Sequence, residues 1–475
     1  MILAAGGRQF PQNSRRFMSG NQKATAAQAA KKENVMAIKV GMVSLGCSKN
    51  QVDAELMLAL IVQGGYELCA DAQACDVVIV NTCGFIEDAK RESIETILEF
   101  AQMKEEGKIR AVVVTGCLAE RYREQVALEI PEADVVLGIG RNAEIIRAIE
   151  DALAGRRTVA FGEKDALPLE GERVLANEPF YAYLKVADGC DNRCSYCAIP
   201  LIRGNFRSRP MEKIVEEAKR LAARGVTELN VVAQDTTRYG EDLYGRLALP
   251  ELLEELCKID GVRWVRILYC YPDRITDRLL DVMARQEKIV KYMDVPIQHV
   301  SGRILKLMNR RGDAEGLAAL MERIRAKVPG VVLRTTLITG FPTETEEEFT
   351  ELCEFIRAAR FERLGCFAYS AEEDTPAGEM DGQIDEEVKR RRAQVVMEQQ
   401  YDIMEEVNRA QLGKTLTVAV EGREGRLWYG RSYMDAPDID TKVFFTSGRG
   451  HLPGDYVEVT IDGVEQYDLK GRALD

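Results

Sequence analysis

The chain is a long succession of short apolar runs, each followed by a segment with a helical pattern, and this alternation constrains the fold most. In the first third the runs cover residues 40–45, 77–80, 111–115 and 135–137. Uninterrupted apolar runs are typical of strands buried on both faces, and the helix-like segments between them indicate parallel βαβ units. We therefore predict an open, doubly wound parallel α/β sheet for this part of the chain.

A second series of runs follows. It covers residues 181–186, 229–233, 265–269, 292–295, 332–338 and 364–368. Since eight βα units close the common (βα)8 barrel, six units predict a partial barrel. We expect ligands at the carboxyl ends of its strands. A long, highly charged helix is predicted over residues 385–410.

After Gly413 the pattern changes to short alternating segments separated by glycines. Strands are predicted at residues 415–420, 426–429, 443–446, 456–461 and 465–469. Five strands in about 60 residues indicate a small antiparallel β-barrel.

These patterns set the predicted domain boundaries. The domains cover residues 37–154, 180–410 and 411–475, with a linker at 155–179. Residues 1–36 carry six Lys and Arg, one Glu and no apolar period, which predicts a disordered extension. An organelle transit peptide is the alternative. We favour translation that starts at Met36, because the first strand pattern begins directly after it.

Charge and hydropathy exclude several classes of protein. The 475 residues include 64 Lys and Arg and 77 Asp and Glu, a net charge of −13. This charge argues against a surface built mainly to neutralise nucleic-acid phosphates. The sequence has no run of 18 apolar residues and no pattern of a secretory leader, so we expect a cytoplasmic protein without a membrane partner.

The chain has twelve cysteines but only two histidines, His299 and His451. A disulfide framework is typical of small secreted domains, so metal binding or catalysis is the better interpretation of these cysteines. With so little imidazole, any metal chemistry here is sulfur chemistry.

Three of the cysteines form a C-x3-C-x2-C motif directly after a predicted strand: Cys190, Cys194 and Cys197. A structural zinc site needs four ligands, and neither a fourth cysteine nor a histidine lies nearby. A ferredoxin-type cluster also uses four thiolates, so three thiolates leave one iron open.

Residues 189–200, Gly-Cys-Asp-Asn-Arg-Cys-Ser-Tyr-Cys-Ala-Ile-Pro, resemble the signature loop of radical S-adenosylmethionine (SAM) enzymes. The resemblance implies that the three cysteines hold a 4Fe-4S cluster whose open iron binds SAM. Cleavage of SAM by an electron from this cluster then yields a 5′-deoxyadenosyl radical. The protein positions these groups and excludes water, while the cofactors carry the chemistry.

Residues after other barrel strands are candidates for contacts with SAM. Gly340, Phe341 and Pro342 resemble the cofactor-cradling segment of the same family, and the signature loop adds Tyr196. Gln234 and Asp235, after the second barrel strand, are weaker candidates. The alternative for the first segment is a helix start, with Thr343 and Glu346 as a capping box.

A second set of cysteines is dispersed: Cys47, Cys83 and Cys117 each follow a strand of the first sheet. Because parallel strands end at one edge, these residues can converge on one site. Cys69 and Cys75 lack this placement. The alternative is that all five are small core residues, as buried cysteines usually are.

The motifs around the dispersed set resemble the amino-terminal domain of methylthiotransferases. They cover residues 45–50, 81–85 and 115–118. The resemblance implies that Cys47, Cys83 and Cys117 bind a second 4Fe-4S cluster that carries or delivers sulfur. One SAM then methylates a sulfur on this cluster, and a second SAM supplies the radical.

The carboxyl-terminal segment bears on the substrate. It resembles the TRAM module, which commonly binds RNA, yet residues 413–475 carry eight Lys and Arg against eleven Asp and Glu, a net charge of −3. A basic protein suits this surface better than an RNA backbone. Residues 45–50, 53–55, 292–299 and 435–440 also resemble the methylthiotransferases that modify a ribosomal protein rather than transfer RNA.

This resemblance implies β-methylthiolation of an aspartate of ribosomal protein uS12, free or in the small subunit. It also implies an electron donor such as flavodoxin or ferredoxin. A tRNA adenosine 2-methylthiotransferase is the first alternative. The second is a non-enzymatic scaffold in which iron–sulfur clusters only stabilise an RNA- or ribosome-binding surface.

Several other residues keep two interpretations. His299, at a strand end, either faces substrate or is structural. The first interpretation of Arg203, Arg207 and Arg209 is that they bind an acidic substrate or the cofactor carboxylate. The second is that they form a solvated basic stretch. Four further cysteines are predicted to be core residues: Cys257, Cys270, Cys353 and Cys366. Of these, Cys270 ends the third barrel strand.

Overall fold

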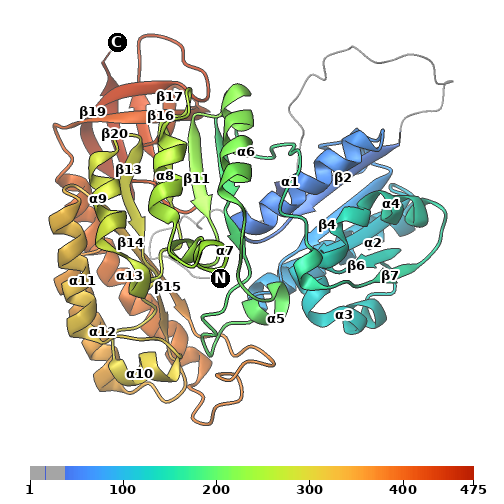
Figure 1. Cartoon of the computed structure of the whole chain (residues 1–475), viewed down its shortest axis with the longest axis horizontal. Helices are drawn as coiled ribbons and strands as arrows, with labels where there is room; N and C mark the ends of the chain where they lie inside the picture. The colour runs from blue at the N-terminus through green and yellow to red at the C-terminus, as the bar shows by residue number, and fades with distance from the viewer. Residues whose placement is uncertain (1–15, 18–37, 475) are drawn as a thin grey trace. The chain divides into compact units, whose positions relative to one another are not determined.

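The computed structural model describes residues 16–17 and 38–474, which form a seven-stranded sheet, a six-stranded sheet, a two-stranded sheet and a closed five-stranded barrel (Figure 1). Helices connect the strands of the two larger sheets. The residues separate into two units. Unit 1 contains Met1–Asn177, Asp188–Asp191 and Cys197–Arg207, and unit 2 contains Glu178–Ala187, Asn192–Tyr196 and Ser208–Asp475. Apart from residues 16–17, the predicted disordered extension at 1–36 lies outside the described residues.

The sheet of unit 1 has the strand order β1-β2-β4-β5-β6-β7, with β3 beside β2. Its strands are β1 (Arg16–Phe17), β2 (Lys39–Ser44), β3 (Glu67–Leu68), β4 (Val77–Thr82), β5 (Ala111–Gly116), β6 (Val135–Leu137) and β7 (Thr158–Ala160). All pairs are parallel except β1 with β2. The predicted parallel α/β sheet is confirmed. Its last strand, β7, falls in the segment expected to be a linker.

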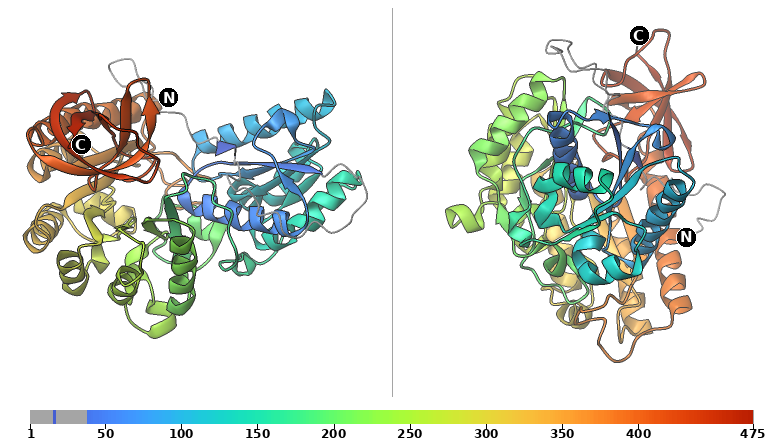
Figure 2. Two further views of the ribbon diagram at one scale, coloured as in Figure 1. Left: turned by 90° about the horizontal axis from the view of Figure 1, so that it is seen from above. Right: turned by 90° about the vertical axis from the view of Figure 1, so that its right-hand side faces the viewer.

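Helices cover both faces of this sheet, as Figure 2 shows. They are α1 (Ser48–Gln63), α2 (Glu87–Glu105), α3 (Cys117–Glu129) and α4 (Ile145–Leu153). On β5, Val112 and Val114 pack in one cluster with Ile97 of α2, whereas Val113 packs in the other cluster with Met57 of α1. Each such buried side chain contributes about 1.5–3 kcal/mol, so the two apolar layers hold the strand ends in place.

Unit 2 contains a second parallel sheet, in the order β15-β14-β13-β12-β11-β8. Its strands are β8 (Tyr181–Lys185), β11 (Glu228–Val232), β12 (Trp264–Ile267), β13 (Ile289–Asp294), β14 (Val332–Thr339) and β15 (Arg363–Ala368). Because β8 and β15 do not pair among the described residues, the six strands form the predicted partial barrel.

Helices follow the strands of this sheet. The longer ones are α6 (Met211–Ala223), α8 (Leu249–Cys257), α9 (Asp277–Arg285), α11 (Ala314–Lys327), α12 (Glu346–Ala359) and α13 (Glu386–Arg409). Short elements are β9 (Ala187–Asp188), α5 (Ile199–Arg203), β10 (Arg207–Ser208), α7 (Glu241–Tyr244) and α10 (Gly302–Leu307). Single 3-10 turns occur at Ala72–Ala74, Ile139–Glu144, Lys164–Ala166, Thr236–Arg238 and Pro272–Arg274.

The last five strands close into a barrel in the order β16-β17-β18-β20-β19. They are β16 (Thr415–Glu424), β17 (Leu427–Arg431), β18 (Val443–Thr446), β19 (Tyr456–Glu465) and β20 (Asp468–Ala473). The prediction of an antiparallel barrel is wrong for one pair, since β18 and β20 are parallel. Strand direction cannot alternate all the way around a closed ring of five strands.

The connection between β17 and β18 ties this barrel to the amino-terminal edge of the β8–β15 sheet. Asp435 accepts a hydrogen bond of 2.6 Å from Arg363, and the Tyr292 hydroxyl donates to Asp440 at 2.6 Å. Arg431 of β17 pairs with Glu228 at 2.7 Å. Glu228 and Arg363 open their strands, so these contacts cover the edge opposite the carboxyl ends where ligands are expected.

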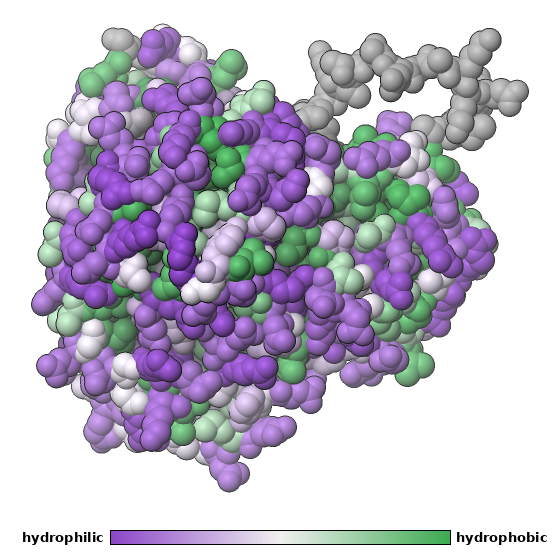
Figure 3. All heavy atoms as spheres, in the orientation of Figure 1, coloured by the Kyte–Doolittle hydropathy of each residue, from purple (hydrophilic) through white to green (hydrophobic). Residues whose placement is uncertain are grey.

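Hydrophilic side chains dominate the face of the molecule drawn in Figure 3, and apolar ones are scattered among them. Within residues 16–17 and 38–474, no helix has both the length and the apolar character needed to cross a membrane.

Candidate functional site

Three cysteines of unit 1 follow three neighbouring strands. Cys47 lies at the amino-terminal end of α1 after β2, Cys83 follows β4, and Cys117 begins α3 after β5. Since β2, β4 and β5 pair in parallel, all three cysteines lie at one edge of the sheet. The packing pattern of the strands fixes this placement.

Glycines let the three loops approach closely. Gly46 has φ +87°, and a Cβ built on it would lie 2.7 Å from the Cys83 sulfur. Gly116 has φ +95°, and its Cβ would lie 2.5 Å from the backbone nitrogen of Thr82. Any side chain at either position would push two of the loops apart.

Buried side chains join the loops by hydrogen bonds. The Asn50 amide donates to the carbonyl of Leu45 at 2.8 Å and to that of Thr82 at 3.2 Å. The Thr82 hydroxyl donates to the Thr115 carbonyl at 2.6 Å, which links β4 to β5. Ser93 Oγ accepts from the Cys83 N–H at 3.0 Å and donates to its carbonyl at 2.9 Å. The strand ends are therefore fixed by polar contacts as well as by apolar packing.

The three thiols differ in their tendency to ionise. Burial raises the pKa of Cys83, and the neighbouring Cys117 and Cys47 raise it further. Burial also raises the pKa of Cys117. At Cys47, burial acts in the same direction, but the charges of Lys49 and Arg203 and two backbone N–H groups outweigh it, so its pKa is lowered. Cys47 is the only one of these three cysteines whose pKa is lowered, so it is the readiest of them to form a thiolate.

Arg203 reaches this edge from α5. Its side chain is 1% exposed, and its Nη2 donates to the Cys117 sulfur at 3.4 Å. The interpretation of a solvated basic stretch is wrong for Arg203, and also for Arg209, which is buried and donates to Glu217 and to the Lys185 carbonyl. Arg207 donates to the carbonyl of Asp165 at 2.6 Å.

The loop with Cys190, Cys194 and Cys197 runs from β9 to α5. In unit 1, the Cys190 N–H donates to the Gly204 carbonyl at 3.1 Å. In unit 2, the Ser195 N–H donates to the Met308 carbonyl at 3.0 Å, and its hydroxyl donates to Leu307 at 2.8 Å. All three cysteines are half-buried, and Tyr196 between them is half-buried too.

Arg310 stands beside Cys194, with Nη1 3.8 Å from its sulfur. It is buried, donates to the Pro296 carbonyl at 2.7 Å and lies 4.3 Å over the Tyr271 ring. No local sequence motif marks Arg310, so it was not predicted as a site residue.

Asp235 and Gln234 both lie after β11. Asp235 is buried, and its Oδ2 accepts from Asn192 at 2.9 Å and from Arg274 at 3.0 Å. Its Oδ1 accepts from the Thr237 hydroxyl at 2.7 Å. Because protein donors already engage both oxygens, Asp235 orders the cysteine loop through Asn192. Gln234 is half-buried.

Gly340, Phe341 and Pro342 follow β14. The Phe341 ring is buried edge-on against Tyr369, with centroids 5.3 Å apart. Glu344 Oε2 accepts from the N–H groups of Gly340 and Phe341, at 2.8 and 3.3 Å. A ligand would therefore meet the backbone of this turn rather than the Phe341 side chain.

The helix after this turn begins later than predicted. Its capping box consists of Thr345 and Glu348, not Thr343 and Glu346, and α12 starts at Glu346. Thr343 has φ +67°, whereas an N-cap residue needs an extended backbone, so the earlier start is wrong.

His299 supports the same turn. It is fully buried, its Nδ1 accepts from the Ser301 N–H at 3.0 Å, and its Nε2 lies 3.5 Å from Glu344. The Nδ1 contact leaves the neutral ring's proton on Nε2, facing Glu344. This geometry favours the structural interpretation of His299. Cys270 is fully buried, in agreement with a core role.

Known families match the chain in three successive segments. Residues 39–138 match the Uncharacterized protein family UPF0004, residues 184–356 the Radical SAM superfamily, and residues 412–474 the TRAM domain. The first segment spans the dispersed cysteines, and the second spans the contiguous ones and the Gly340–Pro342 turn.

Related proteins align with nearly the whole chain. The protein is 52% identical over 443 residues to Ribosomal protein uS12 methylthiotransferase RimO of Pelotomaculum thermopropionicum, a match of 92% of this chain and 100% of that protein. It is 49% identical over 439 residues to the protein of the same name in Lachnoclostridium phytofermentans, with 92% and 100% covered. The chain belongs to the RimO family.

A solved structure agrees with the fold of this RimO family member. The radical S-adenosylmethionine methyltransferase TsrM from Kitasatospora setae, with tryptophan substrate and a SAM analog bound, superposes with a TM-score of 0.51 at 15% identity. The match covers 70% of this chain and 72% of that one. At this level of identity it shows the fold alone.

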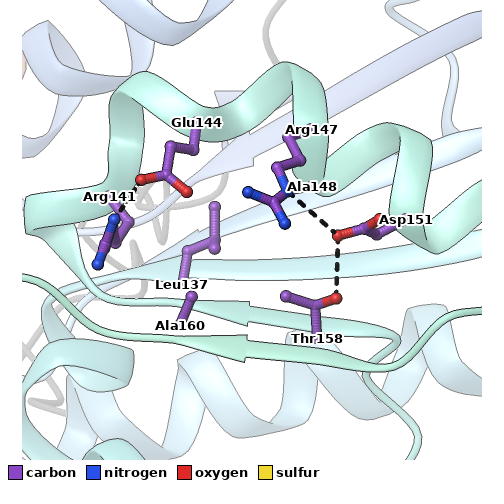
Figure 4. Close-up of a pocket in the computed structure, with 8 residues that line it drawn as sticks. All are labelled: Leu137, Arg141, Glu144, Arg147, Ala148, Asp151, Thr158 and Ala160. Atoms are coloured by element: carbon purple, nitrogen blue, oxygen red, sulfur yellow. Dashed lines mark hydrogen bonds and ion pairs between the residues drawn. The ribbon is translucent and has the colours of Figure 1, made fainter.

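A cavity of about 200 Å³ lies elsewhere in unit 1, between α4 and strands β6 and β7 (Figure 4). Polar side chains that line the cavity interact with one another. Arg141 forms an ion pair with Glu144 at 2.5 Å, and Asp151 accepts a hydrogen bond from Thr158 at 3.0 Å. None of the candidate residues lines this cavity.

Proposed function

We propose that this protein is a radical SAM methylthiotransferase that places a methylthio group on the β-carbon of an aspartate in ribosomal protein uS12. The observation that carries the proposal is identity of about half along 92% of the chain to proteins named for methylthiotransfer to uS12. The two sets of thiols at the carboxyl ends of strands support it from the geometry.

The candidate ligands at the edge of the first sheet are three cysteines, and thiolates are the usual ligands of an iron–sulfur cluster. The thiolates of a cluster bind different irons and need not meet at one point. We assign Cys47, Cys83 and Cys117 to an auxiliary 4Fe-4S cluster, since sulfur-only donors are its usual ligands.

The contiguous set, Cys190, Cys194 and Cys197, is assigned to the radical SAM 4Fe-4S cluster. Residues proposed to contact SAM are Tyr196, Gln234, Asp235, Gly340, Phe341 and Pro342. Phe341 would contribute its backbone, because its ring is buried against Tyr369. Asp235 would act mainly through Asn192 of the cysteine loop.

When bound, the two clusters and SAM supply the electron, the 5′-deoxyadenosyl radical and the sulfur. The residues of the chain hold these groups in place. Arg310 covers Cys194, Glu344 fixes the turn after β14, and the connection before β18 covers the opposite edge of the sheet. Hydrogen leaves the substrate carbon as an atom, so no general base is needed, in keeping with a buried, structural His299.

The charge of the carboxyl-terminal barrel supports a protein substrate. Residues 413–475 carry a net charge of −3, which attracts a basic ribosomal protein and repels an RNA backbone. A ribosomal substrate implies a cytoplasmic enzyme. A low-potential electron donor such as flavodoxin or ferredoxin would reduce the radical SAM cluster.

The test is a competition of substrates. Anaerobically reconstituted enzyme, SAM and a reductant are incubated with uS12 or with tRNA that lacks the methylthio group, and products are identified by mass spectrometry. We expect a methylthio-aspartate in uS12 and no modified adenosine. Methylthiolated tRNA with unmodified uS12 would overturn the substrate assignment.

A further inference from the structure

Arg203 makes an unusual contact for a buried arginine. Its Nη2 donates to the Cys117 sulfur at 3.4 Å, and the residue is 1% exposed. Its positive charge also acts on Cys47. A fixed guanidinium therefore faces the dispersed cysteine set from within the protein.

Three further partners fix the orientation of this guanidinium. Nη1 donates to Asp53 at 2.8 Å and to Asp188 at 3.0 Å, while Nη2 also donates to Asn50 at 3.3 Å. The planar guanidinium fork can serve all of these acceptors at once, which a lysine ammonium cannot. Because the two carboxylates hold Nη1, the N–H that points at Cys117 is held in place before any ligand binds.

Arg203 also connects the two cysteine sets along the chain. It is the last residue of α5, which begins two residues after Cys197. The same helix packs Ala198 and Ile202 against Cys117. One short helix thus starts beside a cysteine of the contiguous set and ends with a side chain on a cysteine of the dispersed set.

We propose that Arg203 is a positioning residue that raises the reduction potential of the auxiliary cluster through its N–H···S contact with Cys117. This inference rests on the proposed function, since it requires a cluster on Cys47, Cys83 and Cys117. Hydrogen bonds to thiolate sulfurs and nearby charge are the main means by which a protein sets such a potential. Loss of the arginine removes the N–H donor and also the positive charge that pairs with Asp53 and Asp188. Both changes disfavour the added electron.

The experiment isolates the auxiliary cluster. In a full-length parent with Cys190, Cys194 and Cys197 changed to Ala, only the dispersed set remains, and its one-electron potential is measured by dye-mediated titration followed by electron paramagnetic resonance. Arg203→Met and Arg203→Lys are compared in this parent. The matched control is Arg173→Met, which removes a buried ion pair with Glu55 of α1.

We expect Arg203→Met to shift the reduction equilibrium about tenfold or more toward the oxidised cluster, which is about 59 mV. Arg203→Lys should shift it less, and Arg173→Met should leave it unchanged. An unchanged potential in Arg203→Met at an unchanged iron content would overturn the proposal, as would an equal shift in Arg173→Met.

If Arg203→Met fails to fold because two buried carboxylates lose their ion pair with the arginine, the potential of Arg203→Lys decides the question. A potential equal to that of the parent then counts against the proposal, and a negative shift supports it. A well-folded parent that holds no iron at all would refute the proposed auxiliary cluster, and this inference with it. Iron content therefore distinguishes failure of the proposed function from failure of the role of Arg203.

Discussion

The two cysteine sets reach the carboxyl ends of their strands in different ways. Cys190, Cys194 and Cys197 lie within eight consecutive residues, in a loop held by backbone hydrogen bonds. Cys47, Cys83 and Cys117 come from three loops and depend on a whole sheet, two close-packed glycines and the Asn50 and Thr82 hydrogen bonds. A contiguous site tolerates changes to the surrounding fold, whereas an assembled site depends on every loop that forms it.

The largest expected effect concerns the contiguous set. Cys197→Ala should reduce formation of 5′-deoxyadenosine about 1000-fold or more, because no cluster could then reduce SAM. Anaerobic turnover followed by chromatography measures the product. Cys257→Ala, at a buried position in neither set, should leave the rate unchanged. Cleavage at the parental rate by Cys197→Ala would refute the assignment of this loop.

The assembled set should separate two products. Cys83→Ala should retain SAM cleavage within about tenfold of the parent but form no methylthio product, because only sulfur delivery is lost. Both products are measured in the same reaction. Normal methylthiolation of uS12 by this variant would show that Cys83 has no part in sulfur delivery.

A glycine pair tests whether the assembled set depends on loop packing. Gly46→Ala places a methyl group 2.7 Å from the Cys83 sulfur at φ +87°. We expect about 1–3 kcal/mol of destabilisation and loss of the auxiliary iron. Gly65 has nearly the same φ, +86°, but a Cβ built on it would meet no atom within 4 Å. Gly65→Ala should therefore lose only the stability that the unfavourable backbone conformation costs, and the variant should keep its auxiliary iron. Equal iron contents in the two variants would contradict the packing argument.

The smallest effect concerns the turn after β14. Glu344 accepts loop N–H groups on Oε2 and Arg392 on Oε1, so the amide of Glu344→Gln must give up one of these bonds. We expect about tenfold weaker SAM binding with unchanged iron content, measured by equilibrium dialysis. Glu346→Gln is the control, since this exposed carboxylate pairs with Arg392 but not with the turn. Equal affinities in both variants would remove the turn from the SAM site.

Strong apolar runs made most strands predictable. The strand predicted at 111–115 is β5, Ala111–Gly116, and the one at 135–137 matches β6. Strand β7 was not predicted, because its three residues are partly exposed at a sheet edge and carry no apolar run. The parallel pair β18–β20 follows from closure of a five-stranded ring, which local pattern does not reveal.

The candidate site was predictable where one motif carries it, and less so where distant residues meet. Thr343–Glu346 and Thr345–Glu348 fit a capping box equally well in sequence, and only the backbone at Thr343 separates them. Three of the four partners of Arg203 lie far away in the chain, and Asp53 is 150 positions earlier. Long-range pairs of this kind follow from the packing of α5, for which the sequence gives no local sign. The ligand roles of the six cysteines stay predictions.

Iron and sulfide content, measured under anaerobic conditions after reconstitution, tests the central claim most directly. Two 4Fe-4S clusters predict about eight iron and eight sulfide per chain, and about four of each when either cysteine set is changed to Ala. A parent with about four iron and four sulfide per chain, and the same content after Cys47, Cys83 and Cys117 are changed to Ala, would contradict the account. The assembled set would then hold no cluster.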